Sequence, residues 1–162
     1  MSEPIKRIVK CPVHLEYTVS AGRAHSRFLA ALTEARLLGG RCSSCRKVYI
    51  PLRSVCPTCA APMSEEVPVA DTGTVTTFCI VNVPFEGQTM KLPYVYASVV
   101  LDGADLPILH LIQIPAEEAR MGLRVKAEWA PPEGRRPTLE SIRWFSPTGE
   151  PDAPFDSFKE HL

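Results

Sequence analysis

The apolar and polar positions near the start of the chain follow the period of an amphipathic helix. Ser26 is a candidate N-cap for this helix, because a serine side chain accepts a hydrogen bond from the first turn. Glycine adopts the left-handed conformation at low cost, so Gly39 and Gly40 predict the helix end. The apolar positions that recur at helical spacing between these limits are Phe28, Leu29, Leu32, Ala35 and Leu38.

From residue 68 onward the period changes to that of β-strands. Strands are predicted at residues 74–83, 94–101, 106–114, 123–129 and 139–145, which are rich in β-branched and apolar residues. Residues 116–121 have room for one helical turn. In the fourth strand the side chains predicted to face inward alternate with polar ones and are Leu123, Val125, Ala127 and Trp129.

Five short strands with a small helical insert between the third and fourth indicate a mainly β fold with an OB-type barrel, although a small sandwich fits the period nearly as well. The expected organisation is an N-terminal extension and helix at 1–40, a zinc ribbon at 41–62, an OB-fold domain at 68–147 and an acidic tail at 148–162. The connection 84–93 has the composition of a functional loop.

Four cysteines carry the strongest chemical signal. Cys42 and Cys45 form one Cys-x-x-Cys pair, Cys56 and Cys59 form a second, and ten residues separate the pairs. Two such knuckles place four sulfurs around one metal ion, and four protein ligands leave no open position for water or substrate. The pattern therefore predicts a structural zinc site. Iron, two disulfides or empty thiols are the alternatives.

Composition narrows the class of protein. Lys plus Arg and Asp plus Glu both total 18, so the chain lacks the basic excess typical of nucleic-acid binders. No apolar run reaches the length of a membrane span, roughly 20 residues. Residues 1–10 mix charged and aliphatic side chains without the pattern of a secretory signal. These features, together with the paired cysteines, favour a cytoplasmic protein.

No catalytic constellation is recognisable from the sequence. Cys79 lies mid-strand and is expected to behave as a small hydrophobe. His110 lies in an apolar strand and is interpreted as a packed histidine rather than a general base. A nucleophile elbow, a phosphate-binding glycine loop and a dinucleotide fingerprint are not found in the sequence.

Charge is unevenly distributed along the chain. Between Glu34 and Glu65 there is no acidic residue, and the tail carries an excess of carboxylates. This asymmetry indicates either a solvated surface or a local anion site, for a nucleotide-type phosphate or an acidic partner surface. The basic residues of the run are Arg36, Arg41, Arg46, Lys47 and Arg53.

The order of parts resembles the family that pairs a rubredoxin-like zinc ribbon with an acyl-CoA-associated OB fold. The resembling stretches are 28–32, 38–42, 48–53, 56–59, 73–78, 122–125 and 142–145. Together the likeness spans about residues 13 to 147. Two departures stand out. Pro51-Leu52-Arg53 replaces the usual paired prolines, and Arg46 and Ala60 stand where a knuckle often has glycine.

The resemblance implies a non-catalytic partner of a thiolase-like enzyme, often a sterol-carrier-type thiolase or retro-aldolase of steroid side-chain breakdown. It implies that Cys42, Cys45, Cys56 and Cys59 bind zinc and that the basic ribbon region and a barrel face border an acyl-CoA channel. It identifies no individual CoA-binding residue. The alternative function is a module that binds single-stranded nucleic acid, which needs a basic face with exposed aromatic side chains.

Overall fold

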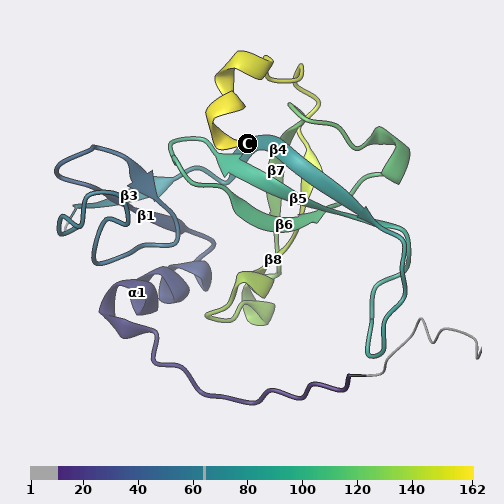
Figure 1. The fold of residues 1–162 in the computed structure, drawn as a ribbon, viewed down its shortest axis with the longest axis horizontal. Helices are drawn as coiled ribbons and strands as arrows, with labels where there is room; N and C mark the ends of the chain where they lie inside the picture. Colours follow the sequence, from purple (N-terminus) through teal and green to yellow (C-terminus); the bar gives the residue numbers. More distant parts are fainter. Residues whose placement is uncertain (1–10, 64) are drawn as a thin grey trace, which may run out of the picture.

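A small three-stranded sheet and a five-stranded barrel lie next to each other, and helix α1 packs on the sheet side (Figure 1). The computed structural model describes residues 11–63 and 65–162. Residues 1–10, for which the sequence predicts no secretory signal, lie outside the described residues. Among those described, no helix combines the length and apolar character needed to cross a membrane.

The small sheet has the strand order β2-β1-β3, and the closed barrel has the order β4-β5-β6-β8-β7. The first part contains α1 (Gly22–Leu32), β1 (Leu37–Arg41), β2 (Val48–Tyr49) and β3 (Glu65–Val69). The barrel contains β4 (Thr72–Val81), β5 (Tyr94–Leu101), β6 (Ile108–Ile112), β7 (Arg124–Trp129) and β8 (Ile142–Pro147). The 3-10 helix η1 (Ala116–Glu118) lies between β6 and β7. The prediction of a mainly β fold with an OB-type barrel is confirmed.

The predicted limits of α1 are wrong at both ends. The helix begins at Gly22, and Ser26 lies inside it, where its hydroxyl donates to the Gly22 carbonyl at 2.6 Å. The helix ends in a Schellman arrangement, in which Ala35 N–H donates to Leu32 and Arg36 N–H donates to Ala31. Ala35 takes the left-handed conformation with φ of 54°. The predicted end of the helix was wrong because alanine occupies a position that usually holds glycine.

The glycine pair predicted to end the helix lies instead within β1. A Cβ atom on Gly39 would come within 2.8 Å of a Val48 side-chain carbon. A Cβ atom on Gly40 would lie 3.0 Å from both Leu52 and Met63. Close packing of the ribbon on β1 therefore accounts for both glycines. Leu38, predicted to be helical, is the second residue of this strand.

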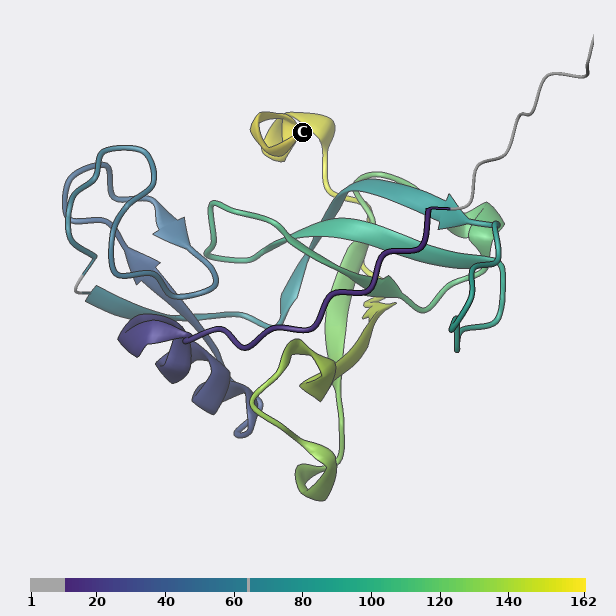
Figure 2. The ribbon, with the colours of Figure 1, turned by 60° about the horizontal axis from the view of Figure 1, so that its bottom comes forward.

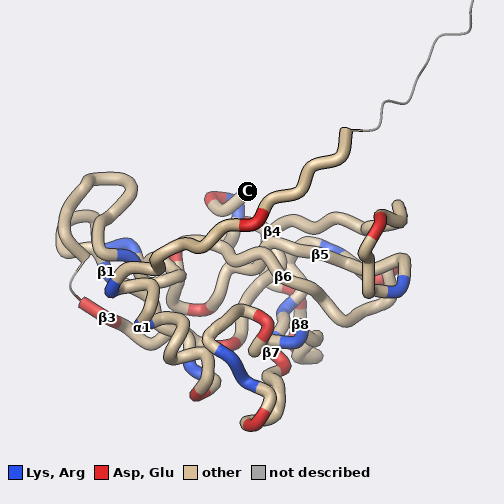
Figure 3. The backbone as a smooth tube through the Cα atoms, turned by 90° about the horizontal axis from the view of Figure 1, so that it is seen from below, with Lys and Arg blue, Asp and Glu red and all other residues tan. Residues whose placement is uncertain are grey.

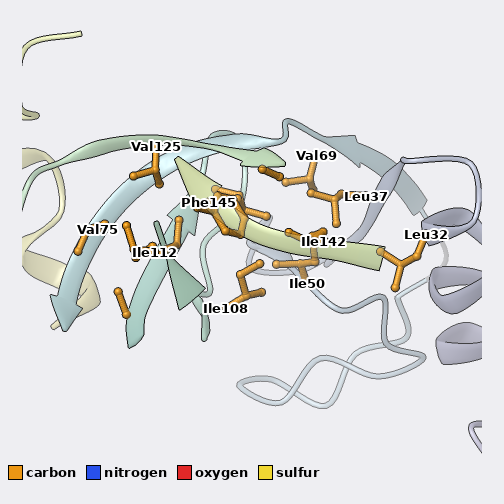
Figure 4. Close-up of a cluster of buried hydrophobic side chains, with 14 of the residues drawn as sticks. Leu32, Leu37, Ile50, Val69, Val75, Ile108, Ile112, Val125, Ile142 and Phe145 are labelled. Atoms are coloured by element: carbon orange, nitrogen blue, oxygen red, sulfur yellow. The ribbon is translucent and has the colours of Figure 1, made fainter. Parts of the chain in front are cut away.

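One hydrophobic core joins the small sheet to the barrel. Figure 4 shows Leu32, Leu37 and Ile50 at one end of this core and Val75 at the other, with Phe145 between them. Phe145 is fully buried. Because both parts contribute to the same buried cluster, we expect them to fold as one unit. The domain limits given above stay a prediction. The ribbon strand β2 shares one sheet with β1 and β3.

The acidic tail folds back over one end of the barrel (Figure 1). Arg120 binds both carboxylate oxygens of Asp152, at 2.6 and 2.9 Å. Ala153 N–H donates to the Gly122 carbonyl at 2.8 Å, and Phe158 is buried with 4% of its surface exposed. At least one carboxylate of the tail, that of Asp152, therefore pairs with a basic residue of the barrel domain.

Candidate metal centre

Two knuckles with the same backbone pattern hold the four cysteines. In the first, Cys42 N–H donates to the Lys47 carbonyl at 2.9 Å and Arg46 N–H donates to the Cys42 carbonyl at 3.1 Å. The second repeats these bonds from Cys56 to Ala61 at 2.9 Å and from Ala60 to Cys56 at 3.0 Å. Each knuckle therefore closes a tight turn that directs its two sulfurs to one side.

The residue after the second cysteine of each knuckle adopts the left-handed conformation. Arg46 has φ of 62° and Ala60 has φ of 55°. Arg46 and Ala60 thus occupy the strained position at which the resemblance to the family predicts glycine. A non-glycine residue in this conformation costs about 1 kcal/mol.

The four sulfur atoms form a compact cluster in which all lie within 4.8 Å of one another. The Sγ atoms of Cys42 and Cys59 are 3.4 Å apart, and those of Cys45 and Cys56 are 3.7 Å apart. A tetrahedron of sulfurs around zinc has edges of about 3.8 Å, given a zinc–sulfur distance of about 2.3 Å. The cysteines that the sequence singles out are therefore brought together with spacings that fit one tetrahedral metal ion.

Backbone amides are directed at the buried sulfurs. Cys45 N–H and Ser44 N–H both donate to Cys42 Sγ at 3.4 Å. The bond from Cys45 N–H is the main reason that the pKa of the Cys42 thiol lies below its usual range. Burial opposes ionisation of Cys56, but the backbone N–H groups of Cys59 and Thr58 lower the pKa of this thiol to about 6.

The same cluster disfavours a negative charge on Cys45. The Lys47 backbone N–H favours the thiolate of Cys45, yet burial and the neighbouring sulfurs raise the pKa of this thiol to about 11. A divalent cation removes this repulsion, because a metal-bound thiol is deprotonated outright. The donor set and its electrostatics therefore fit a soft or borderline divalent ion such as zinc.

The walls of the site come mainly from the ribbon and its flanks, and Leu106 of the β5–β6 connection also packs against them. Tyr49 is buried, with 5% exposed, and its hydroxyl lies 2.7 Å from the Thr58 hydroxyl. Met63 packs in the same small buried cluster as Cys42 and Cys56. Four sulfurs leave no coordination position open, so the chemistry that this arrangement supports is structural.

The other cysteines lie apart from this cluster. Cys79 was expected to be a small hydrophobe within its strand, but its side chain is exposed. The reason is a bulge in β4 between Val75 and Thr77, which shifts the alternation of inward and outward side chains. Cys11 is also exposed.

His110 lies half-buried on β6 and packs edge-on against Phe145, with ring centroids 5.6 Å apart. Its Nδ1 atom is buried and has no hydrogen-bond partner among the described residues. Burial lowers the pKa of the His110 ring below its usual value. No described carboxylate or nucleophile is hydrogen-bonded to this ring, so its position favours packing over proton transfer.

The basic run of the ribbon is partly neutralised. Arg41 and Arg46 both pair with Glu65, at 3.1 and 3.5 Å, and Arg36 pairs with Glu34. The carboxylate that follows the run in sequence thus lies beside it in space. Of the five basic residues, Lys47 and Arg53 have no ion pair within the described part of the chain. The ribbon alone is a weaker anion site than its sequence indicates.

A second feature was not predicted as a site. A pocket of about 530 Å³ lies where the base of the loop 84–93 meets the barrel wall, and its lining includes Lys91, Tyr94, Leu111 and Trp144. The Arg143 guanidinium stacks on the Trp144 ring at 4.1 Å from its centroid. The sequence signals that could have revealed this pocket are Lys91 three residues before Tyr94, which begins β5, and the adjacent Arg143 and Trp144 in β8.

Fold and site together define a protein in which a four-cysteine ribbon of the rubredoxin type is joined to an OB-fold barrel. The chain belongs to the ChsH2 family. Residues 29–63 match the ChsH2 rubredoxin-like zinc ribbon domain, and residues 66–130 match the ChsH2 C-terminal OB-fold domain. The family resemblance inferred from the sequence is thereby confirmed.

Relatives and solved structures agree with this assignment. A DUF35 domain-containing scaffold protein of Methanocaldococcus jannaschii is 30% identical over 92 residues, which are 56% of this chain and 65% of that protein. The chain therefore spans slightly less than two thirds of this relative.

Two solved structures share the fold. A chain of the structure described as "Ltp2-ChsH2(DUF35) aldolase" has a TM-score of 0.60 at 23% identity, covering 80% of this chain and 98% of that one. A DUF35 family protein of unknown function from Sulfolobus solfataricus has a TM-score of 0.56 at 22% identity, with 65% and 78% covered. At these identities the likeness concerns the fold alone.

Proposed function

We propose that this protein is a non-catalytic accessory subunit that binds a thiolase-like enzyme, of the sterol-carrier thiolase or retro-aldolase type, and helps to hold its acyl-CoA substrate. The observation that carries the proposal is the pairing of a ChsH2-type ribbon with a ChsH2-type OB fold in one chain. The scaffold name of the archaeal relative and the aldolase named in the structural neighbour support the same role. The proposed setting is lipid or steroid side-chain metabolism.

The zinc ribbon has a structural part in this proposal. Cys42, Cys45, Cys56 and Cys59 are the proposed ligands of one zinc ion. When bound, the ion supplies a cross-link between the two knuckles and takes no part in a reaction. The chain's own residues complete the site, because backbone N–H groups already donate to the sulfur of Cys42.

The pocket beside the loop 84–93 supports a contact with acyl-CoA. Its apolar lining, which includes Leu111 and Trp144, suits a thioester chain or a pantetheine arm. Lys91 in the pocket and Arg143 on the Trp144 ring supply cations suited to phosphate groups. We propose that the partner enzyme closes this pocket, since it is open to solvent in the single chain.

Co-expression with the thiolase-like enzymes of the source organism tests the proposal. We expect one of them to co-purify with the protein and to turn over acyl-CoA faster in the complex than alone. The variant Lys91→Ala should raise the KM for acyl-CoA, whereas Lys126→Ala, on the exposed face of β7, should leave it unchanged. Failure of every such enzyme to co-purify, together with salt-sensitive binding to single-stranded oligonucleotides, would support the nucleic-acid alternative instead.

A further inference from the structure

The segment before α1 exposes an apolar stripe that the described chain does not cover. Residues 11–20, which we call the N-terminal arm, are all exposed and lead into α1 (Figure 2). Val13, Leu15, Tyr17 and Val19 each expose between 70% and 77% of their surface. Four such side chains in one short segment are unusual, because large apolar groups gather on a surface chiefly at interaction sites.

The spacing of these residues is that of a β-strand. Apolar positions alternate with His14, Glu16 and Thr18, so an extended arm carries all its apolar groups on one face. Glu16 is the sole charged residue of the arm. Figure 3 shows the arm crossing the molecule. No hydrogen bond joins the arm to another described residue, so its backbone groups are unpaired within the described chain. This pattern is typical of a half-buried strand that lacks its sheet.

Most sheet edges of the described chain are poorly suited to receive such a strand, in the same molecule or in a second copy. The barrel is closed, with Ile112 and Phe145 paired across one seam, and residues 77–81 of β4, which pair with β5 alone, form no hydrogen bond with the arm. In the small sheet, the edge strand β2 has two residues, and Pro51 stands two positions after its end. The other edge strand, β3, contains Pro68, which has no N–H to donate, and carries glutamates that discourage pairing.

We infer that the N-terminal arm binds as an added β-strand to an exposed sheet edge of a different protein, with Val13, Leu15, Tyr17 and Val19 seated in an apolar groove beside that edge. This inference rests on the proposed function and names the thiolase-like enzyme as the protein that presents the edge. The stripe from Val13 to Val19 spans about 20 Å when extended, which is the length of an ordinary strand. Backbone bonds supply affinity in this mode, and side-chain pockets supply specificity.

Paired variants of the full chain test the inference in the co-purified complex. Leu15→Ser with Tyr17→Ser removes apolar groups from the stripe, and His14→Ser with Thr18→Ser changes the opposite face. Both pairs lie on the exposed arm, so the melting temperature and metal content should equal those of the wild type. We expect the first pair to weaken binding of the thiolase-like enzyme at least tenfold and the second less than threefold. Amide exchange of residues 13–19 should slow at least tenfold in the complex.

The outcomes separate this inference from the function on which it rests. If the wild type retains no thiolase-like enzyme, the proposed function and the inference both fail. If the wild type and the Leu15→Ser, Tyr17→Ser variant bind that enzyme equally well, the inference fails and the proposed function stands. A homodimer seen by light scattering and lost in that variant would overturn the choice of a different protein as the partner.

Discussion

Asp105 and Val48 exchange two hydrogen bonds across the junction between the ribbon and the barrel. Val48 N–H donates to Asp105 Oδ2 at 2.7 Å, and Asp105 N–H donates to the Val48 carbonyl at 2.8 Å. Asp105 follows the turn at Asp102 and Gly103 that joins β5 to β6. One barrel turn thus holds the outer side of β2, while β1 pairs with its other side.

This relationship predicts the effect of removing the carboxylate. Asp105→Ala leaves the buried Val48 with an unpaired N–H, and we expect it to lower the free energy of unfolding by about 1 to 2 kcal/mol. Asp105→Asn keeps an acceptor oxygen and should lose less than half as much. Urea denaturation followed by the fluorescence of Trp129 and Trp144 measures both changes. Equal stability of all three proteins would show that the bond does not hold the junction.

Removal of a buried cysteine ligand should empty the ribbon of metal. Cys56 is 1% exposed, and Cys56→Ser should reduce metal content from about one ion per chain to a small fraction of that value. The exposed Cys79 provides a matched control, and Cys79→Ser should keep its metal. Elemental analysis of the purified proteins measures the content and separates zinc from iron.

The metal-free protein should also lose order in the ribbon. Ile50 and Leu52 pack in the same core as the barrel, so we expect faster amide exchange in residues 42–59 and a lower melting temperature. A Cys56→Ser protein that keeps one tightly bound metal ion would contradict the proposed ligand set.

Glycine in the second knuckle should stabilise the protein. Ala60 has φ of 55°, so Ala60→Gly removes a conformational strain of about 1 kcal/mol and should raise the free energy of unfolding by a similar amount. Ala61 does not have positive φ, and Ala61→Gly should lower that free energy by about 0.5 to 1 kcal/mol. Chelator-free thermal denaturation compares the pair. A destabilised Ala60→Gly protein would show that the alanine side chain has a packing role.

Local sequence signals predicted the parts of this fold that depend on local structure. The cysteine pairs define their knuckles within a few residues, and the β-branched run of β5 has the same limits, 94–101, in the prediction and in the structure. β1 and β3 were missed because their pairing is long-range. Leu37 pairs with Val69, and neither the glycine pair of β1 nor Pro68 of β3 has the composition of a strand.

The pocket on the barrel wall escaped prediction for a similar reason. Its walls meet only after the barrel closes, because Lys91, Leu111 and Trp144 come from a loop and two strands that are distant in sequence. The sequence also did not show which charged residues pair with each other. The sequence shows a basic run that ends before Glu65, whereas the sheet brings Glu65 beside Arg41.

The titration of His110 should appear in the pH dependence of stability. Burial lowers the pKa of the folded-state ring below the value of about 6.5 in the unfolded chain. The unfolded state therefore binds the proton more tightly, and stability falls as the pH decreases from about 6.5 through the folded-state pKa. The loss has a structural cause, since protonation would place an N–H on the buried Nδ1, which has no partner among the described residues.

Two measurements check this expectation. An NMR titration of the His110 ring should give a midpoint below 6.5. His110→Gln removes the titrating group, so the drop in unfolding free energy between pH 8 and pH 5.5 should be smaller in the variant than in the wild type. His25 lies half-exposed on α1, and His25→Gln is the matched control, which should retain the wild-type drop. A His110 midpoint at or above the unfolded value would mean that solvent or a partner group reaches the ring, and that the barrel wall is open at this point.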